Sequence, residues 1–212
     1  MAEPPGITGL VLAGGQGSRM GGVDKGLALF RGRAMVAHVI ERFAPQVDEL
    51  LLNANRNPAD YAGFGHPVIA DEIPGFAGPL AGFERGLAHA RGALVATVPC
   101  DSPFLPLDLV SRLRRALERE NAQVAFARTG GQSHPVFCLM RRDVHASLRD
   151  FLGSGQRKID KWTAGLALVE VPFDDEAQAF ANINTREELS GLEPPGRQES
   201  PPFSTTSDRT PP

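Results

Sequence analysis

The sequence contains very little cysteine: Cys100 and Cys138 are the only two among 212 residues. Because they form no C-x-x-C pair, neither a disulfide framework nor a zinc site is indicated. The chain also has no apolar run close to the roughly 20 residues that a membrane-spanning helix requires. Its first residues lack the basic and apolar regions of a secretory signal. We therefore expect a cytoplasmic protein with no membrane association.

The chain shows no excess of positive charge. Its formal net charge is −3 and its isoelectric point is near 6.0, whereas a general nucleic-acid binder normally carries a basic stripe. Hydrophobic residues make up 42% of the chain and charged residues 22%, as in ordinary soluble proteins. The length suits one α/β domain with a sizeable core. The composition thus argues against nucleic acid as a partner.

The histidines offer no catalytic or metal-binding pair. They are scattered along the chain, with none at metal-ligand spacing: His38, His66, His89, His134 and His145. No Ser-His-Asp or Cys-His arrangement can be assembled. His134 opens an expected strand and is a candidate for the border of a substrate cleft. The alternative is an ordinary packed histidine.

What the sequence does have is a glycine-rich stretch at residues 10–26, LVLAGGQGSRMGGVDKG. After the apolar run ends at Ala13, five glycines follow in quick succession: Gly14, Gly15, Gly17, Gly21 and Gly22. Glycines let backbone N–H groups approach anionic oxygens closely, and Arg19 and Lys25 can neutralise phosphate charge. The alternative is a strand-to-helix connection with ordinary surface charges. The glycines and cations together favour phosphate binding.

The spacing in this loop differs from the two commonest phosphate-binding motifs. A P-loop requires Gly-Lys followed by Ser or Thr, but Lys25 follows Asp24 and precedes Gly26. A dinucleotide-binding fingerprint that starts at Gly15 or Gly17 fails at its last glycine. The loop therefore predicts a phosphate site of another class.

The two ends of the chain differ from its middle. Residues 1–6 form a short leader, and residues 191–212 are rich in Pro, Ser and Thr with almost no apolar residues. Such a tail buries too little surface to offset the entropy of ordering, so we expect it to be disordered. Residues 7–190 are expected to form a single domain.

Within this domain, short β-like runs alternate with segments of helical hydrophobic spacing. The expected strands are 7–13, 50–53, 68–70, 94–98 and 124–127. Apolar stripes predict helices within 35–43, 80–90 and 109–117, and Thr185 with Glu188 forms a capping box for a last helix. The pattern over 134–140, 144–152 and 168–171 is more mixed. The alternation predicts the α/β class: a single Rossmann-like domain with a mostly parallel, twisted sheet and helices on both faces.

Ligands of such sheets bind beyond the carboxyl ends of the strands. The residues that end the expected strands should therefore converge: Gly14 and Gly15, Asn53, Asp71 and Asp101. Asp101 can hold Mg²⁺ together with phosphate oxygens and water; the alternative is a turn or helix cap. Asn53 and Asp71 can read a base edge, because an amide both donates and accepts and a carboxylate accepts from guanine N–H groups. Turn formation, surface solvation and reading by a backbone group remain open alternatives.

The glycine-rich stretch resembles the signature of nucleotidyltransferases that act on nucleoside triphosphates, L-A-G/A-G-x-G-x-R-M-G followed by lysine. Its doubled glycine and the run GGVDKG are similar to those of the molybdenum cofactor guanylyltransferase family. The chain also resembles that family in P-C-D-x-P around Asp101, in G-P-L-x-G at residues 78–82 and in N-x-N-T at residues 182–185. The resemblance covers roughly residues 7–190 and implies a nucleotide-diphospho-sugar transferase-like fold.

The resemblance implies the transfer of GMP from GTP to the phosphate of molybdopterin, with release of pyrophosphate and with Mg²⁺ held by Asp101. The implied GTP site comprises Leu12, Ala13, Gly14, Gly15, Lys25, Asn53, Asp71 and Asp101. Because a phosphate monoester is already anionic at neutral pH, this reaction needs no general base; positioning and charge neutralisation suffice. The expected catalytic residues are Arg19, Lys25 and Asp101.

The acceptor is expected to bind through the C-terminal half of the chain. The candidate residues are polar or basic: His134, Arg157, Lys158, Asn182 and Asn184. The alternative for these residues is solvated charges and turn-forming amides. Expected partners are GTP, molybdopterin, and the cofactor-insertion proteins or molybdoenzymes that receive the product.

Two other functions remain open. One is a related nucleotidyltransferase that uses CTP, or a sugar-phosphate or alcohol acceptor, although such enzymes more often have L-A-A-G in the loop. The other is a non-catalytic nucleotide-binding protein, which would have no need of Arg19, Lys25 and Asp101 together. Pyrophosphate release with GTP distinguishes these functions from the leading one.

Overall fold

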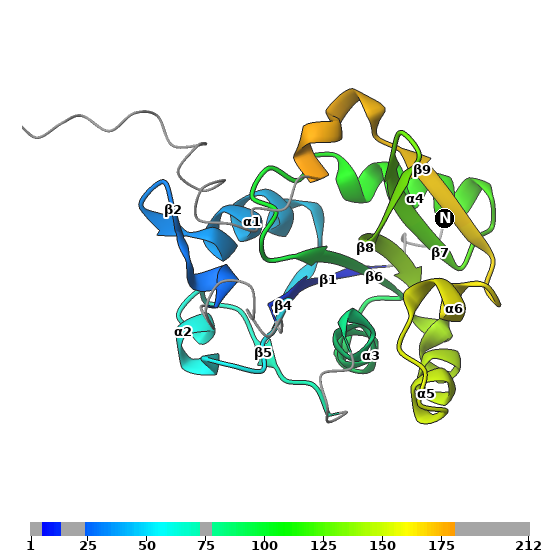
Figure 1. The fold of residues 1–212 in the computed structure, drawn as a ribbon, viewed down its shortest axis with the longest axis horizontal. Coiled ribbons are helices and arrows are strands. Elements are labelled where there is room, and N and C mark those ends of the chain that lie inside the picture. Colours follow the sequence, from blue (N-terminus) through cyan, green and yellow to red (C-terminus); the bar gives the residue numbers. More distant parts are fainter. Residues whose placement is uncertain (1–5, 14–23, 73–77, 181–212) are drawn as a thin grey trace, which may run out of the picture.

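The computed structural model describes residues 6–13, 24–72 and 78–180. Their main feature is a seven-stranded sheet in the order β5-β4-β1-β6-β8-β7-β9, with helices on both faces (Figure 1). β2 and β3 pair separately as a small hairpin. The strands are β1 (Ile7–Leu12), β2 (Leu29–Phe30), β3 (Arg33–Ala34), β4 (Glu49–Asn53), β5 (Val68–Ile69), β6 (Leu94–Pro99), β7 (Val124–Thr129), β8 (Gln132–Arg141) and β9 (Leu168–Pro172). The α-helices are α1 (Met35–Phe43), α2 (Pro58–Ala62), α3 (Pro79–His89), α4 (Leu109–Arg119), α5 (His145–Gly153) and α6 (Ile159–Thr163).

The sheet is mostly parallel, as the alternation predicted. β5, β4, β1 and β6 are parallel to one another, and β7 is parallel to β9. β8 is antiparallel to both β6 and β7. It follows β7 through a tight turn in which Gly130 has a φ of 55°, and such a turn can join only antiparallel strands. The sequence pattern had not indicated this reversal.

The helices expected from the apolar stripes are confirmed as α1, α3 and α4. The mixed C-terminal pattern folds as β8, α5 and β9. The capping box at Thr185 and Glu188, the tail, and all of the leader except Gly6 lie outside the described residues. Within the described ranges, no helix has the length and apolar character that crossing a membrane requires.

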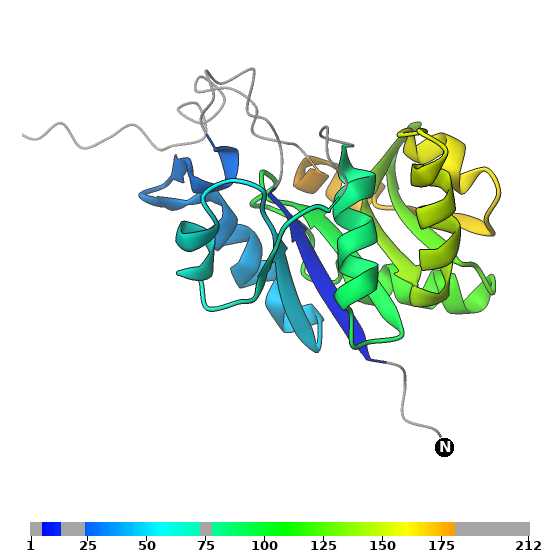
Figure 2. The same ribbon diagram turned by 90° about the horizontal axis from the view of Figure 1, so that it is seen from below.

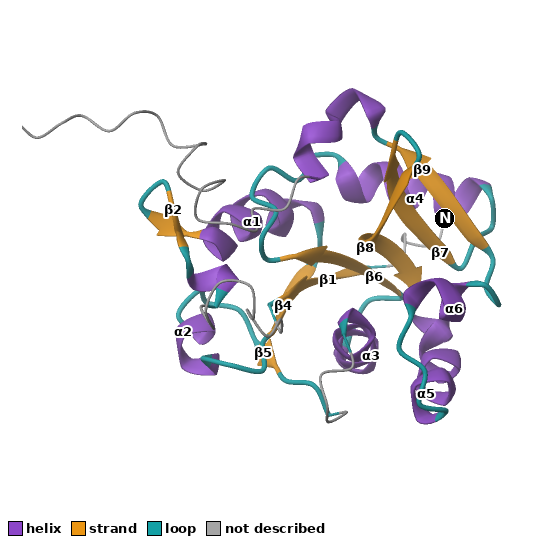
Figure 3. Ribbon diagram, in the orientation of Figure 1, coloured by secondary structure: helices purple, strands orange, loops and turns teal. Residues whose placement is uncertain are grey.

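Two hydrophobic clusters cover opposite faces of the sheet (Figure 3). One packs α1 and α4 against the sheet and includes Phe43 and Leu113. The other packs α3, α5 and α6 and includes Phe83, Leu148 and Trp162. Trp162 is therefore a packing residue.

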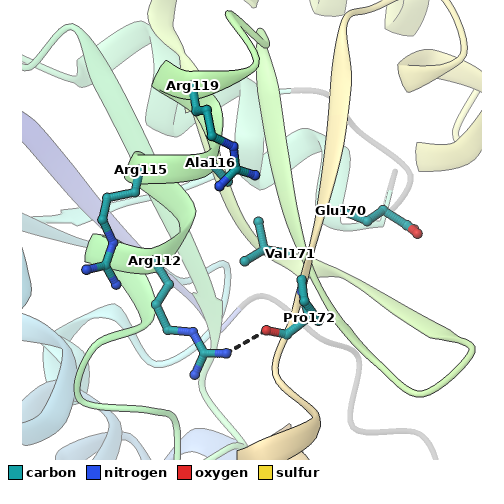
Figure 4. Close-up of a pocket in the computed structure, with 7 residues that line it drawn as sticks. All are labelled: Arg112, Arg115, Ala116, Arg119, Glu170, Val171 and Pro172. Carbon is teal, nitrogen blue, oxygen red and sulfur yellow. Dashed lines mark hydrogen bonds between the residues drawn. The ribbon is translucent and has the colours of Figure 1, made fainter.

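The outermost strand, β9, is tied to α4 by Arg112. A hollow of about 350 Å³ lies between the two elements and is lined largely by arginines of α4 (Figure 4). Arg112 donates to the carbonyl oxygen of Pro172 at 2.5 Å and to both carboxylate oxygens of Asp175 at 2.9 Å. Its guanidinium lies 3.9 Å from the centroid of the Phe173 ring. These hydrogen bonds lower the pKa of Asp175. Arg112 thus joins the helix, the strand and the 3-10 turn after it (Asp174–Phe180).

Candidate functional site

The candidate site lies where three parallel strands end. At the carboxyl end of β1, Leu12 pairs with Asn53 of β4 on one side and with Pro99 of β6 on the other. Figure 2 shows this edge of the sheet uppermost, beside the N-terminal end of α3. The sequence predicted that the polar residues ending these strands would converge, and within the described ranges they do.

Asp101 and Lys25 form an ion pair at this edge. The backbone N–H of Cys100 donates to the carbonyl of Leu12 at 3.1 Å, which keeps the chain aligned with β1 up to Asp101. The Lys25 Nζ lies 3.4 Å from Oδ2 of Asp101. Burial raises the pKa of the Asp101 carboxyl because it removes the charge from water, and the Lys25 ammonium opposes that rise. A further cation at this place would therefore stabilise the ionised carboxylate.

The donor set at Asp101 fits a metal ion that shares its ligands with a nucleotide. In the ranges that the structure describes, no group of three His, Cys, Asp or Glu side chains gathers to hold a metal. An ion at Asp101 would take its remaining ligands from phosphate oxygens and water, as Mg²⁺ does at nucleotide sites. Asp101 is only 9% exposed, so its carboxylate gains from a compensating cation.

A second polar cluster consists of Asn53, Asn55 and Asp71. The amide nitrogens of Asn53 and Asn55 donate to the two carboxylate oxygens of Asp71, at 2.9 and 2.7 Å. The backbone N–H of Asp71 donates to Oδ1 of Asn55 at 2.8 Å. The cluster joins the end of β4 to the end of β5. Asn55 had no separate role in the sequence interpretation, although its place two residues after Asn53 was a usable signal.

Helix α3 approaches this cluster closely because residue 82 is a glycine. A Cβ atom there would lie 2.4 Å from Cδ2 of Leu12 and 2.6 Å from Oδ1 of Asn53. No side chain fits at such distances. The G-P-L-x-G element therefore makes a close helix–sheet contact. The residues just before it, 73–77, lie outside the described residues.

Lys25 stands on a short 3-10 turn, Lys25–Leu27, that Asp24 caps. The Asp24 carboxylate accepts hydrogen bonds from the N–H of Gly26 at 3.2 Å, from Oη of Tyr61 at 2.5 Å and from Nδ2 of Asn57 at 3.1 Å. The sequence pattern indicated no role for Asp24. Its position two residues before Gly26 is typical of a capping aspartate and was a usable signal, whereas Tyr61 is distant in sequence and gave none.

Of the remaining residues predicted for the GTP site, Leu12 and Ala13 lie within the described ranges. Leu12 ends β1, and the N–H of Ala13 donates to the carbonyl of Asn53 at 2.8 Å. Ala13 thus holds the strand end against β4. Five predicted site residues lie outside the described residues: Gly14, Gly15, Arg19, Asn182 and Asn184.

His134 lies toward the same edge of the sheet. β8 runs opposite to β6 with Cys138 beside Thr97, so the beginning of β8 lies near the end of β6. The His134 ring stacks on Phe180 with 4.9 Å between centroids, and its Nε2 lies 2.6 Å from Oγ1 of Thr129. Burial lowers the pKa of His134.

Arg157 and Lys158 lie in the connection between α5 and α6. Nη1 of Arg157 donates to the carbonyl oxygens of Leu152 and Gln156, at 2.8 and 2.6 Å. The guanidinium thus helps to satisfy the carbonyl groups at the end of α5. Lys158 is exposed and flanks the first residue of α6. Acceptor binding by either residue stays a prediction.

Comparisons with known proteins identify the family and the fold. Residues 9–169 match the family described as the MobA-like NTP transferase domain. The chain is 54% identical to the molybdenum cofactor guanylyltransferase of Cupriavidus metallidurans over 188 residues, which cover 86% of this chain and 92% of that relative. Two solved structures share the fold. Molybdopterin-guanine dinucleotide biosynthesis protein A from Archaeoglobus fulgidus has a TM-score of 0.74 and 22% identity, and the match covers 87% of this chain and 95% of that one. Rv0371c from Mycobacterium tuberculosis, in complex with manganese, has a TM-score of 0.62 and 18% identity, with 88% and 97% covered.

Proposed function

The chain belongs to the MobA-like NTP transferase domain family and to the molybdenum cofactor guanylyltransferases within it, and we propose on this basis that it transfers GMP from GTP to the phosphate of molybdopterin. A phosphate oxygen of molybdopterin attacks the α-phosphorus of GTP. A new P–O–P linkage forms, the bond from the α-phosphorus to the bridging oxygen breaks, and pyrophosphate leaves. The products are the guanine dinucleotide form of the cofactor and pyrophosphate.

The observation that supports this function best is the ion pair of Lys25 with Asp101 at the carboxyl end of β1. The 3.4 Å contact puts one cation and one buried carboxylate at the edge of the sheet where such folds bind ligands. The lysine neutralises charge on the transferring group and on pyrophosphate as it departs. The attacking phosphate is already anionic. The chain's own residues therefore have to position the reacting groups and neutralise their charge, and need not remove a proton. Arg19 is proposed as a second neutralising cation, and the N–H groups of Gly14 and Gly15 as phosphate ligands.

Asp101 would hold the divalent ion, which we propose is Mg²⁺. When bound, such an ion neutralises charge on phosphate oxygens. The buried carboxylate supplies one strong oxygen ligand, and Lys25 balances its charge in the free enzyme. A related fold has been seen with manganese, which is consistent with divalent-ion use.

The Asn53–Asn55–Asp71 cluster is proposed to bind the nucleotide beside the phosphates. Each Asp71 oxygen already accepts one amide hydrogen bond. A carboxylate oxygen has room for a second, so Asp71 can still accept from the N–H groups of guanine. The free capacity of Asp71 supports a preference for GTP over adenine nucleotides, because adenine lacks the N–H donors that guanine has on the corresponding edge.

For the acceptor we propose the side of the site toward β8, with His134 at its border and Arg157 and Lys158 as candidates for contacts with the pterin's phosphate. Asn182 and Asn184 are proposed as further acceptor ligands. Cofactor-insertion proteins or molybdoenzymes would then receive the product. Because nucleoside triphosphates are made in the cytoplasm, we place the reaction there.

The test is pyrophosphate release by the purified chain with GTP and Mg²⁺, with and without molybdopterin. We expect release that depends on molybdopterin, and thermal stabilisation by GTP that exceeds that by CTP, ATP and UTP. At a ligand concentration about 100 times the dissociation constant, binding stabilises the folded state by roughly 2.7 kcal/mol, which is readily measured. Stabilisation by CTP or ATP equal to that by GTP would overturn the guanylyl assignment. GTP binding without pyrophosphate release would favour a non-catalytic nucleotide-binding protein.

A further inference from the structure

Lys25 has a long, flexible side chain, and its direction depends on the turn that carries it. A free lysine side chain loses rotamer entropy when it is fixed. Here the turn Lys25–Leu27 is preceded by Asp24, whose Oδ1 accepts the N–H of Gly26 at 3.2 Å. Asp24 is therefore the residue that sets the backbone on which Lys25 stands.

Asp24 is itself held by α2, an element that comes from elsewhere in the chain. Tyr61, which is fully buried, donates through its hydroxyl to Oδ1 of Asp24 at 2.5 Å. Asn57, which precedes the first residue of α2 in a left-handed conformation (φ 49°), donates to Oδ2 at 3.1 Å. Burial raises the pKa of the Tyr61 hydroxyl, so it remains a donor. Both oxygens of the carboxylate are thus fixed.

The backbone of the turn lies close to Tyr61 at Gly26. A Cβ atom at Gly26 would lie 2.3 Å from the Tyr61 Oη and 3.3 Å from Cβ of Cys100, the residue before Asp101. The backbone that carries Lys25 therefore lies close to both the tyrosine hydroxyl and the end of β6.

We propose that Asp24 and Tyr61 are positioning residues, which hold the turn so that the Lys25 ammonium reaches Asp101 and the phosphates that react there. The proposal rests on the proposed function, because it assumes that Lys25 acts on the transferring group. Neither Asp24 nor Tyr61 need touch the substrate. Their effect passes through the backbone of Gly26 to Lys25.

Three variants separate the hydrogen bonds from packing. Tyr61→Phe keeps the buried ring and deletes only the hydroxyl. Asp24→Ala deletes all three accepted hydrogen bonds, whereas Asp24→Asn keeps an oxygen for Gly26 and Tyr61. Leu117→Ala is the matched control, because Leu117 is buried in the same hydrophobic cluster as Tyr61 but has no side-chain hydrogen-bonding group.

We expect kcat for pyrophosphate release to fall by about tenfold in Tyr61→Phe and further in Asp24→Ala, since hydrogen bonds to charged groups are among the stronger ones. Asp24→Asn should recover part of the loss. The KM for GTP should change by less than about twofold, because the lysine's contribution lies mainly in the transition state. A higher KM with unchanged kcat, or losses no larger than in Leu117→Ala, would overturn the proposal.

A second measurement does not depend on the reaction. The amine of Lys25 can be acetylated with an activated ester in the full chain without nucleotide, with Lys158 and Lys161 as internal references in the same mass spectrum. We expect Lys25 to react at least about twofold faster in Tyr61→Phe and Asp24→Ala than in the wild type, because a released side chain leaves Asp101. Unchanged labelling rejects positioning even if kcat falls. If the wild type releases no pyrophosphate, the proposed function fails, and the labelling still decides whether Asp24 and Tyr61 hold Lys25.

Discussion

Asn53 donates a hydrogen bond to Asp71 across 2.9 Å, and this one contact joins the ends of two neighbouring parallel strands. Asn53 is 2% exposed, and its amide nitrogen also donates to the carbonyl of Ile69 at 3.4 Å. Asp71 in turn accepts from Asn55 at 2.7 Å. The side chains that we propose as nucleotide ligands are therefore oriented before any nucleotide binds, which reduces the entropy cost of binding.

Replacing Asp71 with alanine should weaken both folding and nucleotide binding. The amides of Asn53 and Asn55 would lose the carboxylate acceptor, and we expect the free energy of unfolding to fall by about 1–2 kcal/mol. The thermal shift produced by GTP with Mg²⁺ should be largely lost. Urea denaturation measures the first effect and a thermal-shift titration the second. A normal GTP shift in Asp71→Ala would mean that the cluster supports the fold alone.

Removing the charge of Asp101 should abolish activity without harming the fold. Asp101→Asn keeps the shape of the side chain. Because burial raises the pKa of this carboxyl, the folded state disfavours its charge, and we expect a melting temperature at least as high as that of the wild type. Pyrophosphate release should fall by about 100-fold or more. Asp160→Asn, in α6, is the control and should retain activity. Substantial activity in Asp101→Asn at saturating Mg²⁺ would rule out its role as metal ligand.

A methyl group at position 82 should push α3 away from the candidate site. In Gly82→Ala the new Cβ meets Leu12 and Asn53 at well under normal contact distance. We expect a loss of about 1–3 kcal/mol in unfolding free energy and weaker GTP binding. Gly153→Ala is the matched control, because nothing lies within 4 Å of a Cβ there and alanine favours a helix. Equal effects in the two variants would contradict the close-contact explanation.

Stability should depend on pH through His134. Its pKa is lowered in the folded state. As the pH falls below about 6.5, the unfolded chain therefore binds a proton that the folded chain does not yet bind. The stabilising contribution of His134 is complete at higher pH and is lost as the pH falls through 6.5 toward the folded-state pKa. In urea denaturation, the free energy of unfolding of the wild type minus that of His134→Gln should be smaller at pH 5.5 than at pH 7.5. A difference that does not change with pH would contradict this.

The local patterns predicted most of the first half of the fold. The apolar residues over 35–43 repeat with the helical period of 3.6, and the run over 94–98 is typical of a buried strand. Both elements formed where expected. The rule that ligands bind at carboxyl strand ends then placed Asp71 and Asp101 on the same edge. These inferences succeed because they depend on short-range periodicity and on the handedness of parallel connections.

What the sequence could not show depends on contacts between distant residues. Tyr61 reaches Asp24 across 37 positions, and no local spacing indicates such a pair. The reversal of β8 depended on the conformation of Gly130, and a Gly-Gly pair is compatible with several turns. The tightness of the contact at Gly82 likewise depends on where α3 packs, which periodicity alone does not specify.

The way Arg112 meets β9 has a consequence for how the protein behaves at high concentration. Phe173 directs its N–H toward β7, where it donates to the carbonyl of Arg128. The neighbouring Pro172 therefore faces outward, where it has no N–H to offer, and its carbonyl is already taken by Arg112. An incoming strand from another copy would find neither a donor nor a vacant acceptor at this position. This position of β9 is thereby closed to strand-to-strand pairing, and Arg112→Ala should expose that acceptor again.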